Sequence, residues 1–515
     1  MNDEASLVAL STEIGRGHPA YVDSVLAELN RQRPTLAREV ERLAVEDVVT
    51  GAARTAWRLA RRAYQLGASG GAATGAYNRL RGSGPPSAAQ QRLLGAALRE
   101  RFRDFNGICL VEHPLTAAIL APVCRVAYLH AEIAAPAVAA VPGTWRTFVP
   151  LAETAERLAA AGVERDALSV TGLVVEPALV ETAEAGYASR VARLETRKPL
   201  AVGFFVSGAW PRPHLDRIVT AAESVVAAGH RALVFAGPDP RRTERLGTRL
   251  SLITTVSLSN PHRSSRAPGP SDPLVLVTSR DRAEETANAA LLLPSLDAFV
   301  AAAHERTNWA VGLGLPLFAL LPHIGPFAPL NFDFAREHGC CLPLATVADA
   351  ALLDDRLDEL RESGELARMA AVGWHRLPID GAARIALEIA GAVEPPAAGS
   401  FVIRHSSFVI VRGPVDRTRP WFEAVHSAFK QNVARIGRAP GEDAVALEDL
   451  LPADPDAARV RAQVDADLAG KLERLGPLAE SVDRLFELLR DSCSHPSNLY
   501  TEVHWLPVDP ESAEP

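Results

Sequence analysis

The chain has 515 residues, enough for two or three domains with sizeable cores, and its 48% hydrophobic residues are ordinary for a globular protein. A formal net charge of −8 argues against a nucleic-acid-binding protein, and no uninterrupted apolar run approaches the roughly 20 residues of a membrane-spanning helix. The five cysteines show neither CxxC pairs nor metal-ligand spacing, so we expect a reduced, cytoplasmic compartment and no metal site.

The beginning of the chain has the pattern of a strand, a glycine-bearing loop and a helix. An apolar run over 6–10 precedes a loop containing Gly15, Gly17 and His18, and a helical pattern follows over 20–29. This order brings backbone amides and a helix N-terminus to a ligand in α/β proteins. The glycines allow close backbone approach, and an imidazole moves protons near neutral pH. The spacing matches neither a dinucleotide-binding fingerprint nor a phosphate loop, so the loop predicts a ligand site of another kind.

Strand-like and helix-like segments alternate over most of the chain. In the first half, strand-like segments occupy 47–50, 107–111, 125–129, 146–150 and 168–177; in the second half they occupy 200–206, 232–237, 274–278, 298–303 and 317–321. Such alternation predicts parallel sheets with helices on both faces. We therefore predict an α/β protein with two doubly wound, Rossmann-like domains, residues 1–195 and 196–395. They should face one another across a cleft at the carboxyl ends of their strands.

The composition changes after residue 395. The heptad at 400–406 is followed at once by a second segment, 407–412, that begins with the same four residues, Ser-Phe-Val-Ile; this duplication is too short for a structural repeat. Helical periodicity then returns over 421–489. We predict that residues 396–515 form a linker and a mostly helical extension, to which the sequence assigns no role.

Taken together, four segments resemble glycosyltransferases of the GT-B fold, and family 28 in particular. The glycine loop at 15–18 resembles the first glycine-rich loop of that family, and 110–115 resembles its strand ending in His-Pro-Leu. Residues 148–150, through 162–163 and on to 170–177, are similar to its passage into the domain linker. Residues 312–318, with Asn331 downstream, follow the pattern of its nucleotide-sugar site. The resemblance covers roughly residues 5–395 and implies two domains facing across a cleft.

The resemblance implies an inverting hexosyltransferase. It would move a sugar from a nucleotide diphosphate donor, expected to be UDP-linked, to a lipid or other hydroxyl acceptor. The nucleotide sugar is a co-substrate, and no cofactor is implied. A base must take the proton of the acceptor hydroxyl. The candidates are His18 in the loop, His113 after one strand and Glu132 after the next. A turn-capping role for each histidine is the alternative.

The donor is expected to bind the second domain. Free amides at a helix start near Thr307, together with an arginine, would hold a diphosphate without a metal. The alternative is ordinary helix capping by Thr307 or Asn308. The candidate donor-binding residues are Gly208, Glu305, Arg306, Thr307, Asn308 and Asn331.

Two alternatives to a transferase stay open. Trp309 stands where the family carries a ribose-binding glutamate, which is compatible with a catalytically degenerate binding protein. A nucleotide-sugar 2-epimerase would need several acidic and basic groups converging on one sugar, and the sequence alone does not assemble that set.

A basic stretch runs from Arg54 to Arg81 and interleaves arginines with aromatic and apolar residues. This pattern is typical of an amphipathic helix on an anionic membrane surface, and the resemblance implies a membrane-facing acceptor site here. We therefore expect a protein that is peripheral at the inner face of the membrane. A solvated helical face is the alternative.

Overall fold

The computed structural model describes residues 6–12, 17–68, 70–71, 74, 88–196, 198–250, 254–256, 272–393, 408–413 and 502–507. Met1–Val393 form one compact unit and Glu394–Pro515 another. In the second unit, β14 (Phe408–Gly413) pairs in parallel with β15 (Glu502–Pro507). The helical extension predicted over 421–489 lies outside the described residues, as do Gly15 and the basic residues 75–81.

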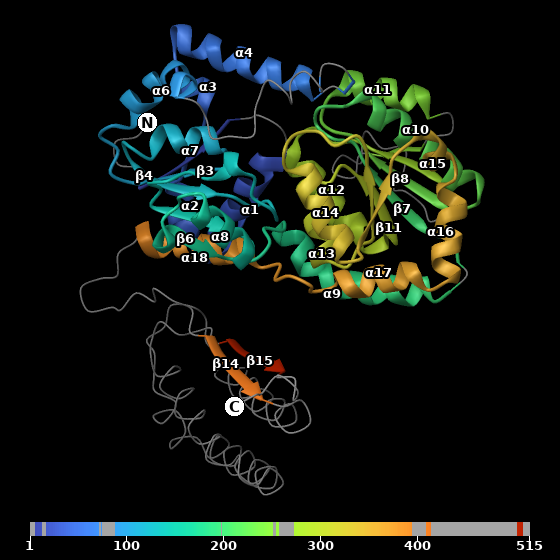
Figure 1. Ribbon diagram of the computed structural model, residues 1–515. Coiled ribbons are helices and arrows are strands. Elements are labelled where there is room, and N and C mark those ends of the chain that lie inside the picture. The colour runs from blue at the N-terminus through green and yellow to red at the C-terminus, as the bar shows by residue number, and fades with distance from the viewer. Residues whose placement is uncertain are drawn as a thin grey trace, which may run out of the picture. The chain divides into compact units, whose positions relative to one another are not determined.

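The first half forms a six-stranded parallel sheet in the order β2-β1-β3-β4-β5-β6 (Figure 1). The strands are β1 (Leu7–Ser11), β2 (Glu41–Ala44), β3 (Ile108–Val111), β4 (Arg125–Leu129), β5 (Arg146–Val149) and β6 (Leu168–Val170). Its helices are α1 (Gly17–Gln32), α2 (Pro34–Glu39), α3 (Val45–Val48), α4 (Gly51–Gly67), α6 (Ala88–Phe102), α7 (Pro114–Leu120) and α8 (Ala152–Ala160).

The strand predicted over 47–50 is wrong. The chain is helical in α3, and the edge strand of the sheet is β2, which pairs with β1. The sequence of β2, Glu-Arg-Leu-Ala, is only partly buried. An edge strand of this kind lacks the continuous apolar run that marks a strand buried on both faces.

The second half forms a seven-stranded parallel sheet in the order β13-β12-β11-β7-β8-β10-β9. The strands are β7 (Ala201–Phe205), β8 (Arg231–Phe235), β9 (Thr254–Val256), β10 (Leu274–Val277), β11 (Ala298–Ala301), β12 (Leu317–Leu320) and β13 (Cys341–Leu344). The predicted fold class is confirmed: an α/β protein with two doubly wound, Rossmann-like sheets of the GT-B type. The domain boundaries near residues 195 and 395 stay predictions.

The helices of the second half are α9 (Pro177–Leu194), α10 (Arg212–Ala227), α11 (Pro240–Arg249), α12 (Arg282–Leu292), α13 (Thr307–Gly312), α14 (Ala328–Glu337), α15 (Val347–Ala351), α16 (Leu353–Glu362), α17 (Glu365–Gly373) and α18 (Gly381–Val393). The last of these returns to the first sheet, where it lies beside α1 (Figure 1). Ile385 and Ile389 pack there in one core with Val25. The first sheet is therefore completed by residues from the end of the compact unit.

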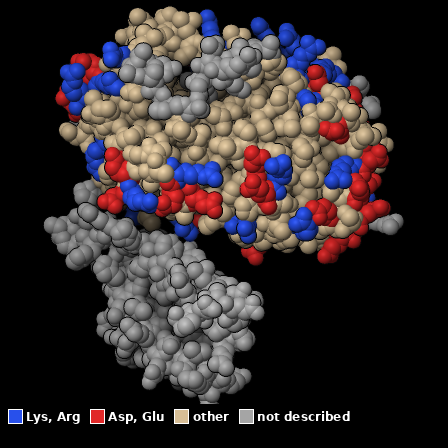
Figure 2. Space-filling view, in the orientation of Figure 1, with Lys and Arg blue, Asp and Glu red and all other residues tan. Residues whose placement is uncertain are grey.

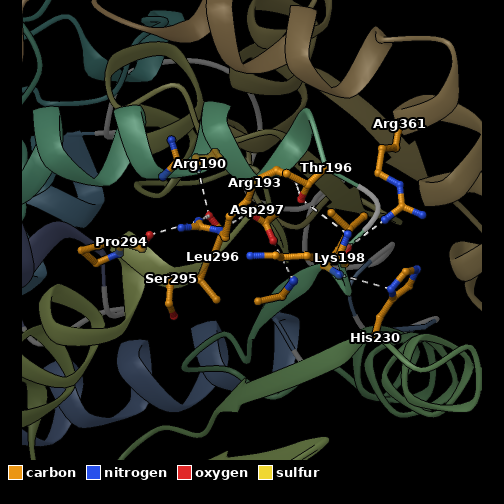
Figure 3. A network of polar contacts seen from close by, with 12 residues as sticks. Arg190, Arg193, Thr196, Lys198, His230, Pro294, Ser295, Leu296, Asp297 and Arg361 are labelled. Atoms are coloured by element: carbon orange, nitrogen blue, oxygen red, sulfur yellow. Dashed lines mark hydrogen bonds and ion pairs between the residues drawn. The ribbon is translucent and has the colours of Figure 1, made fainter. Parts of the chain in front are cut away.

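Buried arginines fix α9 to the second sheet (Figure 3). Arg190 is 1% exposed and donates hydrogen bonds to the carbonyl oxygens of Leu296, Leu313 and Gly314 at 2.8–3.0 Å. Arg193 donates to Asp297 Oδ1 at 2.8 Å, and Asp297 Oδ2 accepts from the backbone of Ala201 at 2.8 Å. Because α9 carries the chain from one sheet to the next, this network sets where the second sheet begins.

We expect Asp297→Ala to lower the free energy of unfolding by about 2 kcal/mol, because the buried Ala201 amide loses its acceptor and Arg193 keeps only the carbonyl oxygens of Pro294 and Leu296. Urea denaturation followed by circular dichroism measures this. The control is Glu156→Ala, which removes an exposed ion pair with Arg165 and should leave the unfolding midpoint nearly unchanged. Equal effects of the two variants would contradict the structural role of Asp297.

Candidate junction site

Side chains from the carboxyl ends of both sheets meet in one buried region, which we call the junction. Asn331 in α14 donates from Nδ2 to Oε2 of Glu132, which follows β4, at 2.6 Å. The two residues are 199 positions apart in the chain, and their exposures are 0% and 4%. The sequence analysis placed these residues on opposite sides of a cleft, and the structure brings them into direct contact.

Glu132 is set up to hold a proton near neutral pH. Burial raises the pKa of its carboxyl group to about 8, the hydrogen bond from Asn331 lowers it in part, and the nearby Glu305 raises it. General acid–base catalysis works best when the pKa of the group lies near the working pH. A carboxyl group with a strongly perturbed pKa at the end of a strand is a functional-site candidate.

Two further acidic groups lie close to Glu132. Glu176 directly precedes α9, and burial raises the pKa of its carboxyl group. Glu305 follows β11 and raises the pKa of both Glu132 and Glu176. Tyr21 in α1 is 3% exposed, and after burial these three carboxyl groups are the main causes that raise the pKa of its phenol. The junction therefore gathers three carboxyl groups around one phenol. We call these three residues the carboxyl cluster.

Imidazoles of the first half surround Phe327, which precedes α14. The ring of His18 lies 5.6 Å from Phe327 and 6.0 Å from His113, and the ring of His130 lies 6.1 Å from Phe327. Burial lowers the pKa of His130 to about 3, and His18 lowers it further, so His130 is neutral near pH 7. The predicted base His18 therefore belongs to the first half and contacts the second half through the ring of Phe327.

His113 has a structural role in the described residues. Its Nδ1 accepts a hydrogen bond from the backbone of Leu115 at 3.2 Å and so caps the N-terminus of α7. Beside it, Glu112 is 1% exposed and accepts hydrogen bonds from Ser11 Oγ and from Thr12 N and Oγ1 at 2.9–3.2 Å. Glu112 thereby fixes the end of β1, where the glycine loop begins. A catalytic role for His113 stays a prediction.

The prediction of free amides at the start of α13 is wrong. The amide of Thr307 donates to His304 O at 2.9 Å, that of Asn308 to Glu305 O at 3.2 Å, and that of Trp309 to Arg306 O at 2.9 Å. A tight turn thus uses the donors that we expected to hold a diphosphate. Asn308 is 2% exposed, and its side chain donates to Val174 O at 3.2 Å, which ties α13 to the first half.

Arg306 is engaged by two carboxylates. It donates to Glu285 Oε1 at 2.9 Å and to Glu305 Oε1 at 3.1 Å. Its guanidinium carbon lies 5.0 Å from the ring centroid of Phe205 and 5.4 Å from that of Trp309. The Trp309 ring is itself buried at 3% exposure, and its Nε1 donates to Glu176 Oε2 at 3.3 Å. A donor contact by Arg306 stays a prediction.

Several buried polar atoms at the strand ends have no hydrogen-bond partner in the described part of the chain. A polar atom left in this state costs about 1–3 kcal/mol, so such atoms are uncommon in folded proteins. Seven of these atoms lie on loops or helices that directly follow strands of the two sheets, which is where ligands of doubly wound folds bind. The atoms are Glu112 Oε2, His130 Nε2, Ser207 Oγ, His214 Nδ1, Thr307 Oγ1, His323 Nδ1 and Asn331 Oδ1.

The other predicted residues lie near these atoms in the sequence. Gly208 follows Ser207 in the loop after β7, and Gly17 is the first residue of α1. Among the residues that the structure describes, no three His, Cys, Asp or Glu side chains are grouped to hold a metal ion. Within the same ranges, none of the helices has the length and apolar character required to cross a membrane.

Sequence reasoning missed Tyr21, Glu176 and His214. Tyr21 follows His18 by three residues and so lies on the same face of α1, a spacing that was available as a signal. Glu176 directly precedes a proline at a helix start, which marks a cap but no chemistry. Nothing in the sequence relates His214 to its neighbours.

No protein-family model and no curated protein matches the chain. Among solved structures it is similar to UDP-GlcNAc 2-epimerase from Neisseria meningitidis bound to UDP-GlcNAc, with 12% identity and a TM-score of 0.44, over 74% of this chain and 98% of that one. It is also similar to HepE from Anabaena in complex with UDP-glucose, with 13% identity, a TM-score of 0.38, and coverage of 75% and 99%.

A third similar structure is UGT2 from Phytolacca americana complexed with UDP-2fluoro-glucose and pterostilbene. It has 10% identity and a TM-score of 0.40, over 72% of this chain and 94% of that one. The overlap with all three structures is too low to carry an argument about what this chain binds. The fold assignment rests on the topology of its own two sheets.

We expect Glu132 to make stability fall as pH rises. Its folded pKa of about 8 lies above the ordinary unfolded value, so its stabilising contribution is complete below about pH 4 and is lost as pH rises through 8. Glu132→Gln has no carboxyl group that can titrate at this position. When the pH is raised from about 5 to about 9, the free energy of unfolding should therefore fall further in the unmodified protein than in the variant, by at least about 2 kcal/mol.

The measurement is urea unfolding at several pH values. The control Glu156→Gln changes an exposed glutamate, paired with Arg165, and should follow the pH slope of the unmodified protein. Parallel slopes for Glu132→Gln and the unmodified protein would show that Glu132 is ionised in the fold at neutral pH.

Proposed function

We propose that the chain is an enzyme that acts on a nucleotide sugar at the junction and transfers the sugar, with inversion, to a hydroxyl acceptor. One observation carries the proposal: groups able to hold or move a proton gather with unpartnered buried polar atoms where the carboxyl ends of two parallel sheets meet. Ligands of doubly wound α/β folds bind at such strand ends. The polyhydroxyl and phosphate groups of a nucleotide sugar supply the hydrogen-bond partners that these atoms lack.

In the proposed reaction, the acceptor hydroxyl loses its proton to a base and attacks the anomeric carbon from the face opposite the leaving group. The new bond joins the acceptor oxygen to that carbon, and the bond from the carbon to the diphosphate breaks. The nucleoside diphosphate leaves with the electron pair. His18 is proposed as the base because its half-buried ring stands at the first-half wall of the junction, beside His113 and Phe327.

Asn331 and Glu132 are proposed to contact the donor sugar. The amide of Asn331 binds Glu132 through Nδ2 and keeps Oδ1 without a partner, so a sugar hydroxyl can donate to it. Glu305 lies beside them and is 16% exposed. We keep the remaining predicted donor residues in the proposal as residues that hold the donor-binding surface in place. They are Gly208, Arg306, Thr307 and Asn308.

We expect the protein to bind at least one of UDP-glucose, UDP-N-acetylglucosamine and GDP-mannose, and to release the nucleoside diphosphate when an acceptor such as diacylglycerol is added. His18→Ala should lower kcat by about 10²–10⁴-fold, because general base catalysis is lost, while donor affinity is nearly unchanged. Calorimetry measures binding, and coupled detection of the released diphosphate measures turnover.

The control variant is His338→Ala, since His338 lies at the end of α14 against Phe334 and outside the junction. Failure of the unmodified protein to bind any of the three donors would contradict the proposal. Binding without turnover over a broad acceptor panel would favour a catalytically degenerate binding protein.

A second candidate, a nucleotide-sugar 2-epimerase, is favoured by the carboxyl cluster. Glu132, Glu176 and Glu305 supply the converging acidic groups that this chemistry needs, with the phenol of Tyr21 among them. An epimerase removes and returns a proton at a sugar carbon. Incubation of UDP-N-acetylglucosamine in deuterium oxide separates the two reactions, because deuterium enters a carbon position of the sugar only if the chain is an epimerase.

We also propose that α4 touches an anionic membrane surface at the cytoplasmic face. Leu59 and Leu66 lie two turns apart on one face of the helix and are 58% and 67% exposed. Trp57 holds the opposite face, because its ring is 1% exposed and its Nε1 donates to Leu94 O at 3.0 Å. Figure 2 shows blue basic atoms among tan ones at the top of the molecule, where α4 lies, and the exposed Arg62 adds a positive charge beside the leucines.

We expect the protein to float with vesicles that contain anionic phosphatidylserine, and the double variant Leu59→Ser with Leu66→Ser to bind about tenfold or more weakly, because two leucines no longer enter the interface. The control is Leu291→Ser, a leucine of α12 with 65% exposure. Equal flotation of both variants, or no flotation of the unmodified protein, would contradict the membrane role.

A further inference from the structure

Three histidines gather at the carboxyl edge of the second sheet. His214 lies in the first turn of α10, His304 follows β11, and His323 follows β12. Burial lowers the pKa of His214 to about 4, and His304 and His323 lower it further. Burial also lowers the pKa of His323, and His304 lowers it further. The three imidazoles therefore lie close together, and we call them the histidine cluster.

His214 keeps one ring nitrogen without a partner in a buried place. Its side chain is 2% exposed, and Nε2 lies 2.9 Å from Pro322 O. A carbonyl oxygen only accepts hydrogen bonds, so Nε2 carries a proton and donates it. Nδ1 has no partner in the described part of the chain, and neither has the buried Oγ of Ser207 in the loop before α10. This loop and this ring nitrogen thus offer two polar groups to a ligand.

The charges that face His214 are all basic. Besides His304 and His323, Arg217 acts on its pKa, and no carboxylate does. The 16-residue helix α10 begins without an acidic residue in its first turn and without a side-chain cap, so the positive end of its dipole is not offset. Opposing groups act only on the other two rings: Glu305 on His304, countered by Arg306, and Asp333 on His323. The place occupied by His214 therefore favours an anion.

We propose that the histidine cluster binds the diphosphate of the nucleotide sugar, with Nδ1 of His214 and Nδ1 of His323 donating hydrogen bonds to phosphate oxygens. The inference rests on the proposed function, from which it takes the diphosphate. His214 is neutral near pH 7 in the protein alone, and a doubly charged anion in contact with the ring raises its pKa. Binding therefore takes up at least one proton.

This uptake fixes the sign of the pH dependence. When the pKa of a group rises on binding, its contribution to affinity is complete at pH values below its pKa in the free protein. That contribution is lost as the pH rises through its pKa in the complex. For one proton, binding weakens by up to about tenfold for each pH unit between the two values. The affinity should therefore fall from about pH 6 to about pH 8, although neither phosphate of UDP-glucose changes charge there.

The experiment is isothermal titration calorimetry of the full-length protein with UDP-glucose, at about pH 6 and about pH 8, in two buffers of different ionisation heat. The expected result is net proton uptake and an affinity at least about fivefold weaker at the higher pH. Uridine, which has no phosphate, serves as the second probe and should show neither effect.

Two variants test the assignment. His214→Gln keeps an amide donor for Pro322 O and removes Nδ1, and His323→Ala removes a half-buried ring. Each should weaken UDP-glucose binding at about pH 6 by about tenfold and flatten its pH dependence, with uridine binding unchanged. His338→Gln, which changes a histidine that contacts Phe334 O at 2.8 Å, is the matched control. Circular dichroism and thermal unfolding verify that each variant is folded.

The outcomes separate the inference from the proposed function. If UDP-glucose binds but both folded variants keep its affinity and pH dependence, the histidine cluster is not the diphosphate site and the proposed function stands. If the variants weaken uridine binding equally, the histidines do not recognise phosphate and the inference is overturned. If the unmodified protein binds none of UDP-glucose, UDP-N-acetylglucosamine and GDP-mannose, the proposed function is overturned and the inference with it.

Discussion

The hydrogen bond between Asn331 and Glu132 is the contact on which the chemistry of the junction depends. It joins the ends of two sheets that are remote in the chain, and it does so with both side chains buried. The raised pKa of Glu132 has burial as its main cause, and part of that burial is supplied by the second half. If the halves separated, water would solvate the carboxylate and its pKa would return toward the ordinary range. Closure of the two halves therefore creates the proton-holding group.

The junction divides into an acidic part and a basic part. The carboxyl cluster lies against Tyr21, and the histidine cluster lies at the start of α10. Arg306 reduces the charge of the acidic part, because it is ion-paired with Glu285 and Glu305 while its guanidinium packs on aromatic rings. A nucleotide sugar has the complementary division, with hydrogen-bond-donating hydroxyls on the sugar and fixed negative charge on the diphosphate. This match supports the proposed substrate class.

The parts of the fold that could be predicted are those whose signal is local. Strands buried on both faces, such as β10 with its Leu-Val-Leu-Val sequence, are continuous apolar runs and were found. The edge strands β2, β9 and β13 were not: half of the β2 residues are charged, β9 has only three residues, two of them Thr, and β13 contains Pro343 and is only half buried. A strand at the edge of a sheet is less buried and does not need a continuous apolar sequence, so hydrophobicity alone does not identify edge strands.

Site residues could be predicted only where they directly follow a predicted strand, because the carboxyl ends of parallel strands lie at one edge of the sheet. His18 and Glu132 were named on that basis, and the structure brings them into the same region as Asn331. The helix-start amides near Thr307 were misjudged because the turn from His304 to Trp309 closes on itself through bonds to residues three positions back. Whether an amide is free depends on the local turn, which the residue types there do not specify.

Trp309 changes the chemistry of the proposed donor side at one position. At 3% exposure, a glutamate in its place would bring a fourth carboxyl group close to Glu176 and Glu305, and burying another like charge there is costly. The indole instead packs on Phe205 and Phe299 and donates to Glu176, which holds that carboxyl group in one orientation. In the proposed donor complex, a ribose contact has to come from a carboxylate that the ligand can reach. Of the two carboxylates bound to Arg306, Glu305 is 16% exposed and Glu285 only 5%, so Glu305 is the one we propose for that contact, with Glu285 left to neutralise the arginine.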